Sequence, residues 1–434
     1  EVVPESEDGS WDKGIGPVNT RLELKEYDPK LFRVLVEIHG EYEYISPSTE
    51  SEIKPWFVGT QPNRYGIDGQ PLPKAEVLEV NLISSYQIEV KFNRQVLNAQ
   101  DKKKYKIVFT PEDGEAQELS DFRVLPYAWD TITLQFGGWY WEEDQYKWAA
   151  GPDFVKGKVG MGVTGDDLQK GEYSHGNPAT LKGDIKLTIL GDDIVDWSGN
   201  ILGTKEYDVV LNPYFDKIKR TDATGIYIYA NNEVKTETIE LCSRFIDEIL
   251  SNETYGQKIA DGITYNNGGL AIIPYGHHAY MQPHLRPAYS VTGLYVEGFG
   301  GGVAQTTEAN AIRDRRSTKY KDEFILGHEF GHTIELTGIR CAIPELYEEI
   351  GQIYEKVTKA GLWPNSYAGS NRNEYFATLT NIWFSTMTES VGGRWNGTWG
   401  PINTREELYR YDIDGYNLMK KIYYNGKETD DSKI

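Results

Sequence analysis

The pentad His328-Glu329-Phe330-Gly331-His332 constrains this chain more than any other segment. Residues four positions apart lie one turn apart on the same face of an α-helix, so His328 and His332 can grip one metal ion. Glu329, on the adjacent edge, can then reach a water molecule beside that metal. The pattern therefore predicts a helix with His328 and His332 as zinc ligands and Glu329 as a base.

The residues around the pentad favour a helix. Ser317 or Thr318 can cap its start, no proline interrupts it before Pro344, and Gly338 is a plausible stop. Apolar residues that could bury it are Phe324, Ile325, Phe330, Ile334 and Leu336. The alternative is a buried helix whose two histidines are only hydrogen-bonded.

A third ligand decides the class of metal site. Metzincins place a Gly three residues and a His six residues after the second His, where this chain has Glu335 and Gly338. Gluzincins instead take a Glu from a following helix. Residues 371–388 are expected to form that helix, with Glu374 in its first turn. A carboxylate among apolar residues is costly unless it is paired or binds metal, although acids also favour first turns through the helix dipole.

The stretch Ser366–Ala377 resembles the second zinc motif of the anthrax lethal factor and Pro-Pro endopeptidase family. That family has a tyrosine seven residues before its glutamate ligand, the spacing of Tyr367 and Glu374, with an aromatic pair and Ala after the ligand. The pentad also matches the lethal factor form, and the gap from His332 to Glu374 has the length that the family uses.

This resemblance covers roughly residues 220–425 and implies a gluzincin peptidase. It implies that His328, His332 and Glu374 bind one Zn²⁺, that Glu329 is the base and that Tyr367 stabilises the transition state. One departure is Thr378, which stands where lethal factor has a second acidic residue one turn after the ligand. The resemblance also implies that residues 303–306, which follow a glycine-rich turn at 298–302, form an edge strand that binds the substrate backbone.

Residues 74–212 are predicted to be all-β, because apolar and polar residues alternate in several short runs separated by turn residues. The runs are 77–83, 87–92, 105–109, 131–136 and 185–190. The pattern is typical of a sandwich and resembles a bacterial immunoglobulin-like module of surface-layer and wall-associated proteins. That resemblance implies a spacer or docking role without catalytic residues.

Two features inside this β region allow a second interpretation. The aromatic residues at 139–141 and 146–148 could form a stacking platform for sugar or peptide, but hairpin or interface packing is the simpler reading. The acidic turns Gly165–Asp167 and Gly191–Asp193 could bind Ca²⁺, although ordinary turn chemistry explains them equally well.

The remaining chain divides around this region. Residues 1–73 are expected to be an extension and linker, with strand-like runs at 32–39 and 42–45. Residues 213–434 are expected to be an α+β zinc peptidase domain. Its predicted strands are 225–229, 270–275 and 291–296. Its further predicted helices are 235–250, 344–359 and 405–423.

The other histidines and the two cysteines leave alternatives open. His277, His278 and His284 lie beside prolines and could form a second metal site, or they could be loop residues near a cleft wall. Cys242 and Cys341 could form a disulfide, which suits secretion, or remain buried thiols.

Charge and hydropathy narrow the possible partners. The net charge of −21 and the isoelectric point near 4.9 disfavour nucleic acid and anionic membranes. No apolar run is long enough for a membrane-spanning helix. Because the first residue is Glu1, a leader or another segment is expected to have been removed or to be absent from this sequence. We therefore expect a secreted or cell-surface monomer that binds a protein or peptide substrate. Association with the cell envelope stays open.

The preferred interpretation is a zinc endopeptidase whose whole active site lies within residues 220–434. Two alternatives stay open. One is an envelope-associated binding or adhesion protein in which the peptidase-like domain is a scaffold. The other is a zinc amidase or peptidase that acts on cell-wall peptide.

Overall fold

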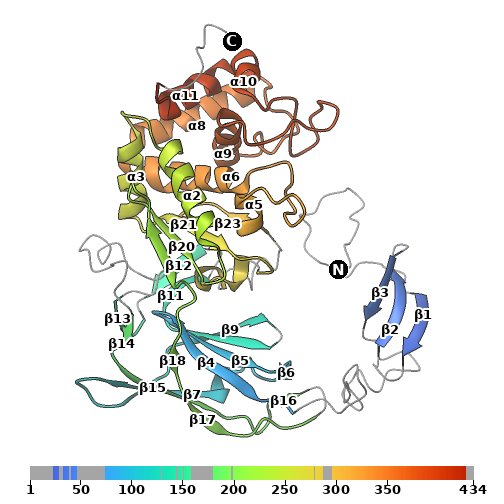
Figure 1. Ribbon diagram of the computed structural model, residues 1–434, viewed down its shortest axis with the longest axis vertical. Coiled ribbons are helices and arrows are strands. Elements are labelled where there is room, and N and C mark those ends of the chain that lie inside the picture. The colour runs from blue at the N-terminus through green and yellow to red at the C-terminus, as the bar shows by residue number, and fades with distance from the viewer. Residues whose placement is uncertain are drawn as a thin grey trace.

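The computed structural model describes residues 74–426 except 129, 143–144, 150, 158–178, 197–198, 278 and 287–295, together with the backbone of three earlier strands. These strands, β1 (Glu23–Asp28), β2 (Arg33–Ile38) and β3 (Glu41–Ile45), form an antiparallel sheet in that order. After them comes a β-rich region, and then a region dominated by helices (Figure 1). The strand-like runs predicted at 32–39 and 42–45 correspond to β2 and β3.

Two sheets enclose the core of the β-rich region. The first sheet has the order β18-β4-β5-β10-β9, and the second has the order β17-β15-β7-β8. The strands of the first are β4 (Val77–Ser84), β5 (Gln87–Phe92), β9 (Arg123–Ala128), β10 (Thr131–Gln135) and β18 (Val210–Leu211). Those of the second are β7 (Tyr105–Pro111), β8 (Gln117–Leu119), β15 (Gly183–Ile189) and β17 (Lys205–Asp208).

Alternation of side chains explains this core. Ile88, Val90 and Phe92 of β5 are buried, as are Ile107 and Phe109 of β7, so one face of each sheet supplies the apolar cluster. All five strands predicted from the alternating runs are confirmed, with small shifts of their ends. Short pairs flank the sheets: β6 (Val96–Leu97) with β16 (Val195–Asp196), and β13 (Val155–Lys156) with β14 (Thr180–Leu181).

The aromatic segment forms a hairpin. β11 (Gly138–Glu142) pairs antiparallel with β12 (Gln145–Ala149), and Trp139 stands opposite Trp148. The backbone therefore forms a hairpin, the arrangement expected if these aromatic residues serve hairpin packing. The side chains of this hairpin, and the acidic turn at 165–167, lie outside the described residues.

The second region contains a five-stranded sheet with the order β19-β20-β21-β23-β22. The strands are β19 (Lys217–Arg220), β20 (Tyr227–Ala230), β21 (Gly269–Ile273), β22 (Gly298–Phe299) and β23 (Val303–Thr307). β20, β21 and β23 are parallel, whereas β22 runs antiparallel to β23. The expectation that 303–306 is the edge strand is therefore wrong, because the returning strand β22 covers β23 and forms the edge itself.

Helices cover one face of this sheet. They are α2 (Thr236–Ile249), α3 (Gly256–Tyr265) and α6 (Ile325–Thr333), and Figure 1 shows them on the side of the sheet away from the β-rich region. Ile226 and Ile228 point into the helical core, whereas Tyr227 and Tyr229 belong to a separate cluster with Phe215 on the opposite face. Period-two alternation therefore buries both faces of the central strands.

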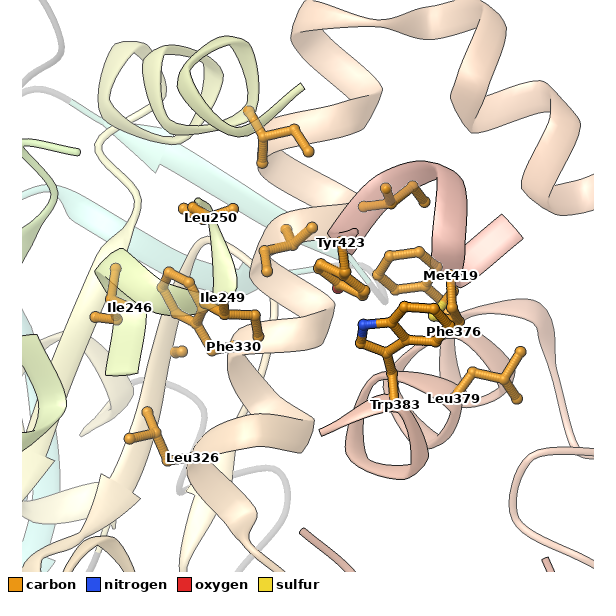
Figure 2. Close-up of a cluster of buried hydrophobic side chains, with 14 of the residues drawn as sticks. Ile246, Ile249, Leu250, Leu326, Phe330, Phe376, Leu379, Trp383, Met419 and Tyr423 are labelled. Carbon is orange, nitrogen blue, oxygen red and sulfur yellow. The ribbon is translucent and has the colours of Figure 1, made fainter. Parts of the chain in front are cut away.

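A second layer of helices packs on α6. It consists of α8 (Pro344–Lys359), α9 (Arg372–Trp383), α10 (Arg405–Tyr411) and α11 (Ile413–Tyr423). Figure 2 shows Ile246 and Ile249 of α2 on one side of α6, and Trp383 of α9 with Met419 of α11 on the other. α8 has the predicted bounds. The single helix predicted at 405–423 is instead two helices, because Asp412 ends α10 and caps α11 through the amide of Gly415.

Several predicted ends in this region are wrong. α6 begins at Ile325, and its first amide donates to Asn310 Oδ1 rather than to Ser317 or Thr318. Gly338 does not stop the helix, since the chain continues as a π-helix (Ile334–Ile339) and then α7 (Arg340–Ala342). Gly338 is small because α3 packs there: a Cβ on it would lie 2.6 Å from a methyl of Ile259. α9 ends at Trp383 rather than near 388.

Cys242 is buried and Cys341 is exposed, and both are free thiols. Of the strand predicted at 291–296, only Val296 lies within the described residues. The two main cores draw on residues 75–209 and 226–423. The domain boundaries at 73/74 and 212/213 stay predictions. Among the helices that the structure describes, none combines the length and apolar character needed to cross a bilayer.

Candidate metal centre

Two glycines allow the helices that carry the candidate ligands to approach closely. Gly327 and Gly331 lie one turn apart on the face of α6 that meets α9. A Cβ on Gly327 would lie 2.4 Å from Asn381 Oδ1, and one on Gly331 would lie 3.2 Å from Ala377 Cα. The glycine inside the pentad therefore sets the distance between α6 and α9.

The start of α9 places Glu374. Asn371 caps the helix, and its side-chain oxygen accepts hydrogen bonds from the amides of Asn373 and Glu374 at 3.0 and 3.1 Å. Glu374 is thus the third residue of the helix, and its side chain, with 15% of its surface exposed, points toward α6. Its position in the first turn was correctly predicted.

The three predicted ligand residues converge. Glu374 Oε2 lies 3.0 Å from His328 Nε2 and 3.2 Å from His332 Nε2, and the two imidazole nitrogens lie 3.2 Å apart. A tetrahedral ion with ligand distances of about 2.0–2.1 Å separates its donor atoms by about 3.3 Å. The donor set therefore has nearly the spacing that one such ion requires. It is the one group of three or more possible ligands that converges within the described part of the chain.

The protonation of these ligands depends on their carboxylate neighbours. Burial raises the pKa of Glu374, but hydrogen bonds and charge from His328 and His332 outweigh burial and hold this pKa at about 2. Burial lowers the pKa of His332, which favours the neutral imidazole that a metal ligand needs. For His328, the carboxylates of Glu323 and Glu374 outweigh burial and raise the pKa well above 6.5. A metal ion at this site would therefore compete with protons.

Glu329 lies beside the ligands and faces the cleft. Burial raises the pKa of its carboxyl to about 8, and the carboxylates of Glu374 and Glu323 act in the same direction. A carboxyl group with a pKa in this range can both accept and deliver a proton near neutral pH. This is the position that the spacing of the pentad predicts.

Tyr367 stands on the loop between α8 and α9, with its ring against His328. The two ring centroids lie 5.8 Å apart with an angle of 21° between the rings. Its amide donates to Thr398 O at 2.9 Å, which ties this loop to the segment after α9. Burial and the carboxylate of Glu374 raise the pKa of the hydroxyl, so Tyr367 keeps its proton and can act as a donor.

Glu323 was not predicted, although it touches the centre. Its carboxylate lies 3.1 Å from His328 Nδ1, on the side of the ring opposite Glu374. Asn381 and Trp399 donate to the same carboxylate at 3.2 and 3.4 Å. Glu323 therefore orients His328. It comes from the segment before α6, whereas the resemblance directs attention to Thr378, one turn after Glu374.

Glu323→Ala is expected to weaken metal affinity by about 10–100-fold, because His328 loses the carboxylate that lies beside its Nδ1. Glu323→Gln should lose less, since the amide keeps a polar side chain of nearly the same shape beside the ring. Titration of the metal-free protein with zinc measures both constants. Equal affinities in wild type and both variants would remove Glu323 from the support of the site.

A second contact joins the π-helix that follows α6 to the start of α9. Glu335 is fully buried, and Arg372 Nε lies 3.1 Å from its carboxylate. The guanidinium of Arg372 also stacks on the ring of Tyr347, 3.9 Å from its centroid. Because Arg372 is two residues before Glu374, this pair helps to hold the start of α9. The sequence offered Glu335 only as the residue that excludes a metzincin.

His328, His332, Glu374 and Glu329 lie at the base of a cleft of about 1360 Å³. Gly298, Phe299 and Gly300 line one wall, and a Cβ on Gly298 would lie 2.7 Å from Glu329 Cγ. Residues 396–399 and Tyr367 also line the cleft. The glycines therefore let the edge strand β22 lie directly against α6.

The other candidate metal sites do not converge within the described residues. His277 contacts Tyr214 and Glu233, and the half-buried His284 contacts Gln305. His278 lies outside the described residues. Asp193 pairs with Lys104, and Asp192 accepts from Thr204, as in an ordinary acidic turn.

Comparison with known proteins identifies no family. No family model matches the chain, and neither does any curated protein. The crystal structure of the S-layer protein rSbsC(31–844) matches 35% of this chain and 16% of its own, with 14% identity and a TM-score of 0.19. The N-terminal part of the bacterial S-layer protein SbsC matches 35% and 27%, with 13% identity and a TM-score of 0.19. This chain spans less than a third of these structures, and likeness of this degree supports no conclusion about fold or function.

Proposed function

We propose that this protein is a zinc endopeptidase. The observation that carries the proposal is the convergence of His328, His332 and Glu374 at the base of a cleft, with Glu329 beside them. Two imidazoles and one carboxylate leave a tetrahedral zinc ion one open position, as catalytic zinc sites require. The finer assignments, a gluzincin-type domain after an immunoglobulin-like sandwich, belong to the same proposal, as does a secreted or cell-surface location.

Each cleft residue has a role in peptide hydrolysis. When bound, zinc would supply a Lewis acid that polarises the scissile carbonyl and makes water a better nucleophile. The Glu329 carboxylate accepts the proton of the attacking water and then delivers it to the leaving amine nitrogen. The Tyr367 hydroxyl donates a hydrogen bond to the oxygen of the tetrahedral carbon. No covalent bond between enzyme and substrate is required.

The test combines metal analysis with a cleavage profile. The purified protein should hold about one zinc per chain, and it should cleave internal bonds in a diverse peptide library. Removal of zinc by a chelator should stop cleavage, and added zinc should restore it. A protein that holds zinc but cleaves neither library peptides nor muropeptides would instead favour the scaffold alternative. Cleavage of muropeptides alone would favour the cell-wall peptidase.

Tyr367→Phe should lower kcat by about 10²–10³-fold, or roughly 3–4 kcal/mol, because one oxyanion donor is lost. The ring that stacks on His328 is retained, so KM and zinc content should change little. Steady-state kinetics and the melting temperature, measured on the same preparation, check this expectation. Wild-type kcat with a lowered melting temperature would show that Tyr367 only packs against the histidine.

A further inference from the structure

The outer face of the first sandwich sheet is polar but buried. Side chains of β5 and β10 alternate, so Ile88 and Leu134 enter the sandwich core while Gln87 and Gln135 point away from it. Strand register places Gln87 opposite Gln135, and Glu89 opposite Thr133. Gln87, Gln135 and Thr133 have no exposed surface. Polar residues on such a face are normally exposed to water, so their burial shows that another part of the chain covers this face of the sheet.

Arg286 of the second region occupies this surface. Its side chain is 1% exposed, and Nη1 lies 2.7 Å from both Glu89 Oε2 and Thr133 Oγ1. Its Nε and Nη2 donate to Met281 O at 2.9 and 2.8 Å. The guanidinium of Arg286 therefore binds both the sandwich sheet and the backbone of Met281, five residues before it in the chain. Beside it, Gln87 Nε2 donates to Pro283 O at 2.7 Å.

The same short segment binds the sheet that carries the cleft wall. His284 Nε2 lies 2.6 Å from Gln305 Nε2 on β23. Gln305 is 1% exposed and pairs with Phe299 of β22. A Cβ on Gly298 would lie 2.8 Å from Gln305 O and 2.7 Å from Glu329 Cγ. Contacts thus run without interruption from the sandwich, through residues 281–286, to the wall of the cleft.

The connection between the regions is also firmly placed. Asn212 and Tyr214 donate their amides to Leu82 O and Ile83 O at 3.0 and 2.9 Å, which extends the pairing along β4. Phe215 then packs against Tyr229 and lies 6.1 Å from the ring of His284. The sandwich therefore approaches the second region with a defined orientation.

We propose that Arg286 is a positioning residue, through which the sandwich sheet holds β22 in register against Glu329. This inference rests on the proposed peptidase function for its catalytic consequence, but not for its structural one. If so, the sandwich is more than a spacer, because it fixes the position of the strand that lines the cleft. A small displacement of β22 should affect the cleft because Gly298 packs closely against α6, where even a Cβ atom would lie 2.7 Å from Glu329 Cγ.

Amide hydrogen exchange tests the positioning without any need for turnover. In the full chain, Arg286→Met should leave the half-buried Glu89 without its partner and loosen segment 281–286. Amides of 296–307 should then exchange at least about tenfold faster, while those of α9 keep their protection. Thr133→Val, which removes one hydrogen bond and keeps the ion pair, should show a smaller effect in the same peptides. If Arg286→Met does not fold, Thr133→Val and Arg286→Lys decide the question.

Kinetics test the consequence for the cleft. With a peptide that wild type cleaves, Arg286→Met should lower kcat/KM by about 10–100-fold, mainly through KM, at unchanged zinc content. Arg286→Lys should recover part of the loss. Glu118→Gln, which breaks the exposed Lys106–Glu118 pair of the other sheet, is the matched control and should change neither constant.

Two results would overturn the inference. One is unchanged exchange at 296–307 in every Arg286 and Thr133 variant. The other is a lowered melting temperature with wild-type KM and kcat, which would show a purely structural role. If wild type cleaves no peptide, the proposed function fails, and hydrogen exchange alone still decides whether Arg286 positions β22.

Discussion

The Glu329→Gln protein is expected to fold, to hold about one zinc per chain and to lose most of its turnover. An amide has nearly the shape of the carboxyl but cannot accept the proton of water, and proton transfer by a placed side chain contributes about 10²–10⁴-fold. Glu329 is not among the three convergent donors, so zinc content should not change. Peptide cleavage, metal analysis and the melting temperature, all on one preparation, measure the three properties.

A control separates this effect from a general change of charge. Glu348 is an exposed glutamate of α8, away from the pentad, and Glu348→Gln should behave as wild type. Burial disfavours the charged form of Glu329 and raises its pKa, so the neutral amide should leave the variant at least as stable as wild type. Wild-type kcat in folded, zinc-loaded Glu329→Gln would exclude Glu329 as the base.

The Glu374→Ala protein is expected to lose zinc and, with it, activity. Removal of an orienting neighbour costs about 10–100-fold in metal affinity, so removal of a ligand should cost more than about 100-fold. Two imidazole nitrogens 3.2 Å apart would remain, without the carboxylate oxygen that now lies 3.0 and 3.2 Å from them. Competitive titration with a chromophoric chelator measures the affinity, and added zinc should restore only part of the cleavage activity.

The competing interpretation of Glu374 is that it complements the dipole of α9. Glu237 provides the matched control, since it stands in the first turn of α2 and is exposed. Glu237→Ala should lower stability by about 0.3–1 kcal/mol and leave zinc affinity unchanged. If Glu374→Ala behaves in the same way and keeps full zinc occupancy, the ligand assignment is wrong.

Acid should release the metal from wild type, because zinc binds the deprotonated forms of these residues. The carboxylates that raise the pKa of His328 also raise the pH at which a proton competes for its ring. Zinc occupancy measured from neutral to acidic pH should therefore fall. Occupancy that stays constant down to a pH at which the histidines are protonated would contradict the ligand assignment.

Local sequence pattern was enough for much of the fold. Alternating runs located the main strands of the β-rich region, and the predicted bounds 344–359 agree with α8. Helix ends were less predictable, because α6 is capped by Asn310, which comes from a neighbouring element rather than from the preceding residues. The split between α10 and α11 likewise depends on Asp412, whose carboxylate also accepts from the distant Trp363 and Tyr375.

The sequence by itself determined the members of the candidate centre. His328 and His332 share a helix face because of their spacing, and Asn371 places Glu374 in the first turn of α9; both effects act over one helical turn. Only the tertiary structure decided that these two turns meet, because Gly327 and Gly331 let the two helices approach. It also decided that Glu323 orients His328 and that Arg286 reaches Glu89. Such contacts join residues far apart in the chain, and no local periodicity or propensity encodes which distant side chain will fill a buried position.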